Sequence, residues 1–199
     1  MREKRAGMTA VELLARLASD PEYEAMRAAN DRKLAEIAER RRQEQEVLLS
    51  DLAGVGVVVD WVGRLLEART PSERIYPILL DHIARPYSPS LLEWIGRAFG
   101  RRSARSIVWD RLVTLIKTHA LTEPAAEGVI EALSVMARPG DLPTLIDLLS
   151  DPSLGPGRVY LVRNLMRSKK QEARTALLRA QADPDLTMEF SARLSRSGS

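Results

Sequence analysis

The helical architecture follows from one stretch of sequence, Leu145-Ile146-Asp147-Leu148-Leu149-Ser150-Asp151-Pro152, because three other stretches align with it without gaps. Each copy begins with leucine and a branched aliphatic residue, and the third residue is never apolar. The first leucines of successive copies are 33, 33 and 32 residues apart. Such a constant period indicates an array of stacked repeats. The other three copies are Leu79–Pro86, Leu112–His119 and Leu177–Pro184.

Each copy has the apolar spacing of one helix, and a second amphipathic segment follows each copy. A unit of two helices and about 33 residues cannot bury its apolar stripe alone, so neighbouring units must stack. We therefore predict an all-α protein, built as an α-solenoid of about four helical hairpins. The second helices are expected at residues 90–99, 124–137, 158–166 and 185–194.

The third repeat resembles a HEAT repeat of the short bacterial kind. The resemblance lies in the proline of its first helix (Pro143), its Asp151-Pro152 turn and Arg158 at the start of its second helix. It extends over about residues 71–195, although the period is shorter than the 40–47 residues of most HEAT units. It implies a curved scaffold whose second helices line the concave side, and it implies no particular reaction.

The residues before the repeats form a separate N-terminal module in this interpretation, with a domain boundary between residues 70 and 71. The module is similar to the leader of small bacterial HEAT-repeat proteins. A short helix is expected at about residues 10–19 and a long one at about 21–50. The long helix carries the run Glu39–Glu46, which has no apolar residue and is typical of a solvated face or of an arm that docks on a partner.

Composition excludes several kinds of chemistry. The 199 residues include no cysteine and two histidines, so a disulfide framework, thiol catalysis and histidine-rich metal sites are not expected. The formal net charge is +3 from 30 basic and 27 acidic residues, a small surplus for a nucleic-acid-binding protein. We predict no enzymatic activity, no cofactor and no metal. The sequence shows neither a targeting signal nor a membrane span, so we expect a cytoplasmic protein.

The histidine His82 occupies a repeat position that is otherwise filled by Leu115, Leu148 and Ala180. This position faces the core, so we expect a buried, hydrogen-bonded histidine. A role for His82 in metal binding or catalysis would need a partner such as Asp81 or His119. Adjacent residues on a helix point apart, which argues against Asp81.

The candidate site is the polar stripe of the second helices, where we expect a protein or peptide partner to bind. Its charge changes sign along the repeats, which favours recognition of a folded protein or peptide. We expect Glu127, Glu131, Arg163 and Arg167 to set the charge register, Arg97 and Arg101 to form one rim, and Tyr160 to act as an aromatic anchor.

Two basic clusters, within residues 97–111 and 158–179, keep a second hypothesis open. They would suit a phosphate backbone, as in the HEAT-like DNA alkylation-repair glycosylases. A third hypothesis is a lyase-like HEAT protein that acts on a chromophore-bearing partner. Only the predicted scaffold supports that third hypothesis.

Overall fold

The computed structural model describes residues 9–11, 17, 19–68, 72–187 and 190 of the chain. Every regular element in these ranges is helical and none is a strand, so the all-α prediction is confirmed for this part of the protein. The predicted helices at 10–19 and 185–194 lie largely outside the described residues. The chain divides into two compact units, residues 1–44 and 45–199.

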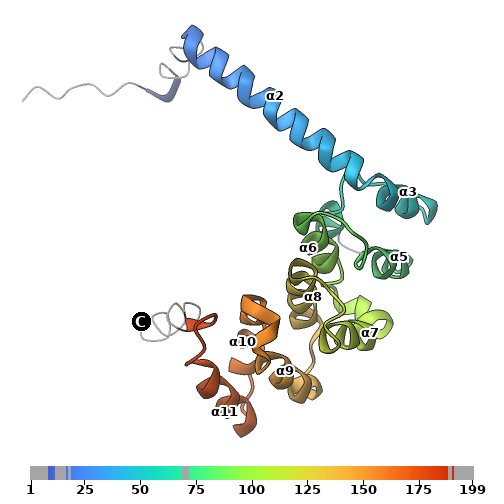
Figure 1. The fold of residues 1–199 in the computed structure, drawn as a ribbon, viewed down its shortest axis with the longest axis vertical. Coiled ribbons are helices and arrows are strands. Elements are labelled where there is room, and N and C mark those ends of the chain that lie inside the picture. Colours follow the sequence, from blue (N-terminus) through green and yellow to red (C-terminus); the bar gives the residue numbers. More distant parts are fainter. Residues whose placement is uncertain (1–8, 12–16, 18, 69–71, 188–189, 191–199) are drawn as a thin grey trace, which may run out of the picture. The chain divides into compact units, whose positions relative to one another are not determined.

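The first unit contains the long helix α2 (Pro21–Glu44), shown in blue in Figure 1. Asp20 opens it, because its Oδ1 accepts the backbone N–H of Glu22 at 3.0 Å. No residue of α2 is buried. Its charged side chains pair along the helix instead, as Arg42 does with Glu39 at 3.1 Å.

The prediction of one helix from 21 to 50 was wrong, because the helix is interrupted at Gln45. The Gln45 side chain is buried, and its Oε1 accepts the backbone N–H of Val62 at 2.9 Å. A new helix, α3 (Glu46–Gly54), follows and buries Leu48 and Leu52. These contacts place residues 45–68 in the same compact unit as the repeats, so the compact units divide after Glu44 and not after residue 70.

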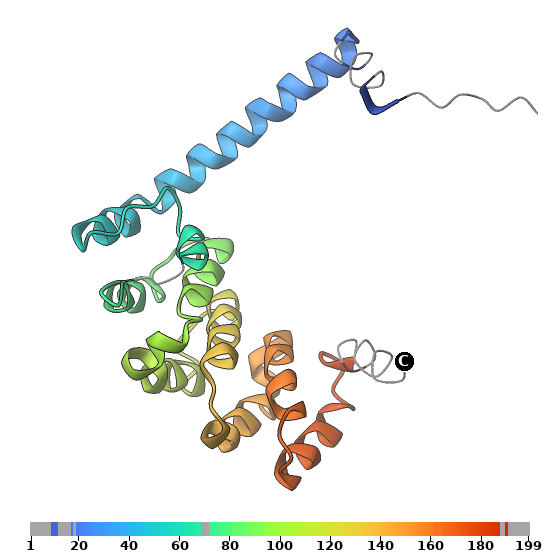
Figure 2. The same ribbon diagram turned by 180° about the vertical axis from the view of Figure 1, so that it is seen from behind.

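The second unit continues with a series of helices of 4 to 14 residues, coloured from teal to red-brown in Figures 1 and 2. Three of the four predicted second helices appear as α6, α8 and α10, each within one residue of its expected ends. Short 3-10 turns lie at Arg102–Ala104 (η1), Pro139–Asp141 (η2) and Pro152–Arg158 (η3). The α-helices are α4 (Arg64–Glu67), α5 (Ile75–His82), α6 (Pro89–Ala98), α7 (Arg105–Lys117), α8 (Glu123–Met136), α9 (Leu142–Leu149), α10 (Val159–Met166) and α11 (Gln171–Ala180).

One apolar core runs through this unit from Leu48 to Phe190. Helix α6 packs on α8, and α8 packs on α10, so that the three second helices are neighbours in chain order. Helices α7 and α8 also pack together, as do α9 and α10. The repeated leucines supply the core, since Leu79, Leu112 and Leu145 are all at most 2% exposed.

Candidate functional site

Helices α6 and α8 touch backbone to backbone where Gly96 crosses Gly128. A Cβ atom added to Gly96 would lie 2.8 Å from the carbonyl carbon of Gly128, closer than real side-chain atoms approach. A Cβ atom on Gly128 would likewise lie 3.0 Å from the backbone nitrogen of Arg97. Only glycine permits this approach, which brings the polar side chains of the two helices within bonding distance.

Arg97 on α6 is the centre of the polar contacts between the second helices. Its Nη2 lies 2.7 Å from the Oε1 of Glu93, and its Nε lies 2.7 Å from the Oε2 of Glu131 on α8. The Nη2 also donates to the Tyr160 hydroxyl of α10 at 3.2 Å. That hydroxyl donates in turn to the Oε1 of Glu127 at 3.4 Å. We call these five residues the Arg97 network.

Aromatic rings extend the network toward the start of the second unit. The guanidinium carbon of Arg97 lies 5.4 Å from the ring centre of Trp94, a cation–π distance. Trp94 meets Trp61 edge to face, with ring centres 5.0 Å apart. Arg97 is therefore held from several sides, and its side chain is only 25% exposed.

The contacts of Arg97 and Tyr160 shift the pKa values of both side chains. Partial burial on its own lowers the pKa of Arg97, but Glu131, Tyr160 and Glu93 outweigh it and raise the pKa above the ordinary value. Burial is also the main reason that the pKa of Tyr160 is raised, and Glu131 adds to it while Arg97 opposes it. The network thus holds one cation, one carboxylate on α6, two carboxylates on α8 and a protonated hydroxyl.

The structure brings together four of the seven residues that the sequence singled out: Arg97, Glu127, Glu131 and Tyr160. Arg101 lies elsewhere, because its Nη2 donates to the backbone carbonyls of Leu65 and Leu66 at the end of α4. Arg163 on α10 and Arg167, directly after that helix, are exposed, and no ion pair joins either of them to another described residue. They follow Tyr160 by three and seven residues, a spacing that keeps them on one helix face.

Two members of this site escaped the sequence prediction: Gly96 and Gly128. A signal existed for the glycines, since glycine inside a helix costs about 1 kcal/mol relative to alanine and so points to close packing. Their separation of 32 residues also follows the repeat period.

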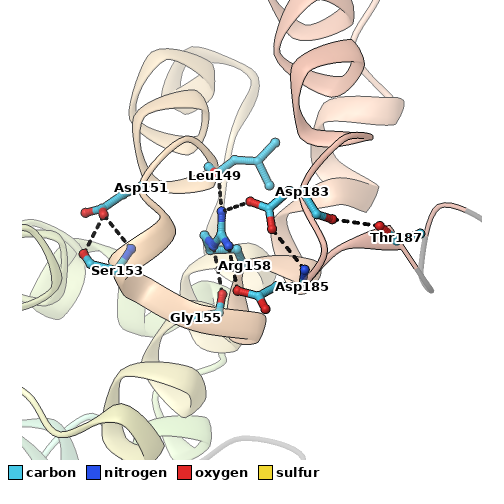
Figure 3. A network of polar contacts seen from close by, with 8 residues as sticks. All are labelled: Leu149, Asp151, Ser153, Gly155, Arg158, Asp183, Asp185 and Thr187. Carbon is cyan, nitrogen blue, oxygen red and sulfur yellow. Dashed lines mark hydrogen bonds and ion pairs between the residues drawn. The ribbon is translucent and has the colours of Figure 1, made fainter.

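A second polar network surrounds Arg158, which is 1% exposed (Figure 3). Its Nη1 lies 2.6 Å from the Oδ2 of Asp183, and its Nη2 lies 3.1 Å from the Oδ2 of Asp185. The guanidinium also donates to the carbonyls of Gly155 at 2.8 Å and Leu149 at 3.2 Å. Arg158 thus joins η3, the end of α9 and the turn after α11, and its role is structural.

His82 is buried, as the sequence predicted, and both ring nitrogens have a partner. Its Nδ1 lies 2.7 Å from the Tyr87 hydroxyl and its Nε2 lies 2.9 Å from the Oδ2 of Asp51. Asp51 lies 31 residues away on α3, so the helical pattern around His82 contained no sign of it. The arrangement joins α3 to α5.

Within the described part of the chain, no three histidine or acidic side chains are grouped closely enough to hold a metal ion. No helix of that part combines the length and the apolar composition that crossing a bilayer requires. Comparison with protein-family models, with curated proteins and with solved structures finds no match to this chain.

Proposed function

We propose that the chain is a short α-solenoid of HEAT-like hairpins whose second helices bind a protein partner without catalysis. The binding surface consists of the exposed parts of α6, α8 and α10. Support comes from the packing of these three helices in chain order and from the polar and aromatic side chains that they present on neighbouring turns.

The Arg97 network is the observation that carries this proposal. Its side chains are fixed by contacts with one another, so little side-chain entropy remains to be lost when a partner binds. Arg163 and Arg167 continue the same surface and are exposed. A surface with an acidic centre and a positive edge suits a partner that places acidic side chains at that edge.

Recognition of a nucleic acid is the second candidate function. Fewer unpaired basic side chains remain for contacts with phosphates than the sequence suggested. Arg97 and Arg105 of the first cluster are paired with carboxylates, and so is Arg158 of the second. A nucleic-acid complex would weaken steeply with added salt, because phosphate contacts release counterions. A gel-shift titration of duplex and single-stranded DNA and RNA at low and high salt tests this candidate.

Site-specific photo-crosslinking tests the proposed surface. A photo-reactive amino acid is placed at Arg163 in one variant and at Arg111, an exposed residue of α7, in the control. In the source cells, we expect one defined protein to crosslink at position 163 and not at position 111. The crosslink should also disappear when Tyr160→Ala is added. Equal crosslinking at both positions, or none at position 163, contradicts the proposal.

A further inference from the structure

A cavity of about 410 Å³ lies where the C-terminal ends of α8 and α10 meet η2. Its apolar wall includes Val135, Leu142 and Leu145. Ser134, Asn164 and Ser168 add neutral polar groups, and the Asn164 side chain is fixed by donating to the Ser134 carbonyl at 2.7 Å. This volume is in the range of pockets that hold small organic ligands.

Five basic side chains line this cavity, and among the described residues none that line it carries a carboxylate. They converge from four parts of the sequence: η1, the loop after α8, the end of α10 and the loop before α11. All five residues are exposed, and no ion pair to another described residue neutralises any of them. The five residues, which we call the basic pocket, are Arg102, Arg138, Arg167, Lys169 and Lys170.

This pattern differs from that of other arginines in the same unit. Arg97, Arg105 and Arg158 each have a carboxylate within 2.8 Å. Cations near the ends of α8 and α10 are stabilised by the helix dipoles, but a dipole accounts for a single charge at one helix end. It does not explain why Arg102 of η1 and Lys170, which precedes α11, face the same cavity.

We propose that the basic pocket binds a small organic phosphate in which at least two adjacent anionic groups are attached to an apolar body, as in a nucleoside diphosphate. A single carboxylate would leave most of the five positive charges uncompensated. Neighbouring phosphate groups concentrate several negative charges in a small volume, and the forked guanidinium group matches their oxygens. The apolar wall formed by Val135, Leu142 and Leu145 would hold the rest of the molecule.

This proposal goes beyond the proposed function, because it requires no protein partner. The test is isothermal titration calorimetry on the full chain with ADP, pyrophosphate, inorganic phosphate and adenosine. We expect ADP to bind most tightly, pyrophosphate more weakly, and adenosine and inorganic phosphate most weakly. Because a hydrogen bond to a charged group is worth roughly 1.5–3 kcal/mol, Lys169→Ala with Lys170→Ala should weaken ADP binding by about tenfold or more.

The matched control is Arg174→Ala with Arg179→Ala, which removes two exposed charges from α11 without touching the basic pocket. It should bind ADP as the unmodified chain does. A further variant, Val135→Ala, shortens an exposed side chain of the apolar wall and should weaken ADP binding more than pyrophosphate binding. Circular dichroism and thermal unfolding establish that each variant is folded.

Two results would overturn the proposal. One is the absence of measurable ADP and pyrophosphate binding to the folded, unmodified chain at low salt. The other is an equal loss of ADP binding in the pocket variant and in the Arg174/Arg179 control, since that would mean diffuse attraction to net positive charge. Crosslinking at Arg163 to a protein is a separate readout, so either proposal can fail while the other stands.

Discussion

The Nε of Arg97 on α6 lies 2.7 Å from the Oε2 of Glu131 on α8, in a part of the surface where both side chains are at most one third exposed. An ion pair in this position is screened less by solvent than one at the surface, and the Tyr160 hydroxyl adds a further bond to the same guanidinium. The pair therefore links α6 to α8 and holds part of the surface that we propose for partner recognition.

Replacing Arg97 by Met should destabilise the chain by about 1 to 2 kcal/mol, because Glu131 would lose its cationic partner in a half-buried position. Glu131→Gln should cost a similar amount. The double variant should cost less than the two single changes added together. Urea unfolding of the four proteins measures this coupling, and strictly additive changes would show that the pair contributes nothing to stability.

Gly128→Ala should destabilise the chain by about 2 kcal/mol or more, since the new methyl group would force α8 away from the backbone of α6. Helix propensity alone predicts the opposite sign, a gain of about 1 kcal/mol. The control is Gly140→Ala, where an added Cβ meets nothing within 4 Å. Thermal unfolding distinguishes the two, and a stabilised Gly128→Ala variant would contradict the close crossing.

Arg158→Met should cost about 3 kcal/mol, because it removes the cation between Asp183 and Asp185 and leaves the Leu149 carbonyl without this donor. Arg174→Met on the exposed face of α11 should change the stability by less than about 0.5 kcal/mol. Denaturant unfolding measures both. Equal, small effects would mean that the buried guanidinium contributes little net free energy.

Lowering the pH should remove the stability that the ion pair between Arg158 and Asp183 contributes. The hydrogen bond from Arg158 is the main cause that lowers the pKa of Asp183 below its ordinary value of 3.8. A lowered pKa means that the folded state favours the charged form. The contribution of the Asp183 carboxylate to stability is therefore complete above the ordinary pKa of 3.8. It is lost as the pH falls through the lower pKa that Asp183 has in the folded state.

The variant Asp183→Asn tests this dependence. It should be less stable than the unmodified chain near pH 5, and the difference should shrink toward about pH 2. Asp110→Asn on α7, an exposed position, is the control and should show no such trend. Unfolding free energies at a series of pH values provide the measurement; a difference that does not change with pH would rule out this linkage.

The helices of the repeats were predictable from sequence because apolar spacing acts locally. The expected second helix at 124–137 is α8, Glu123–Met136, and the buried position of His82 followed from its repeat column. The break at Gln45 was not predictable, since its cause is a hydrogen bond to Val62, 17 residues away. Local propensity in a charged, alanine-containing segment favours a continuous helix there.

The sequence predicted on which helix faces the candidate site lies, but it did not predict the ion pairs and hydrogen bonds within the site. Helical spacing placed Glu127, Glu131 and Tyr160 on the faces of second helices, and the structure brings them to Arg97. Sequence could not show that Arg97 pairs with Glu131, because that depends on how closely α6 approaches α8. Arg101 was assigned to a rim for the same reason, whereas its partners are carbonyls of α4.

The Arg158 contacts limit how far the array can be shortened. Repeat proteins are often trimmed or extended by whole units, because each unit depends mainly on its neighbours. Here the counter-charges of a guanidinium inside one unit come from Asp183 and Asp185 of the next. A chain that stopped after α10 would lose both ion-pair partners of this buried guanidinium, so we expect such a truncation to destabilise the helices that remain.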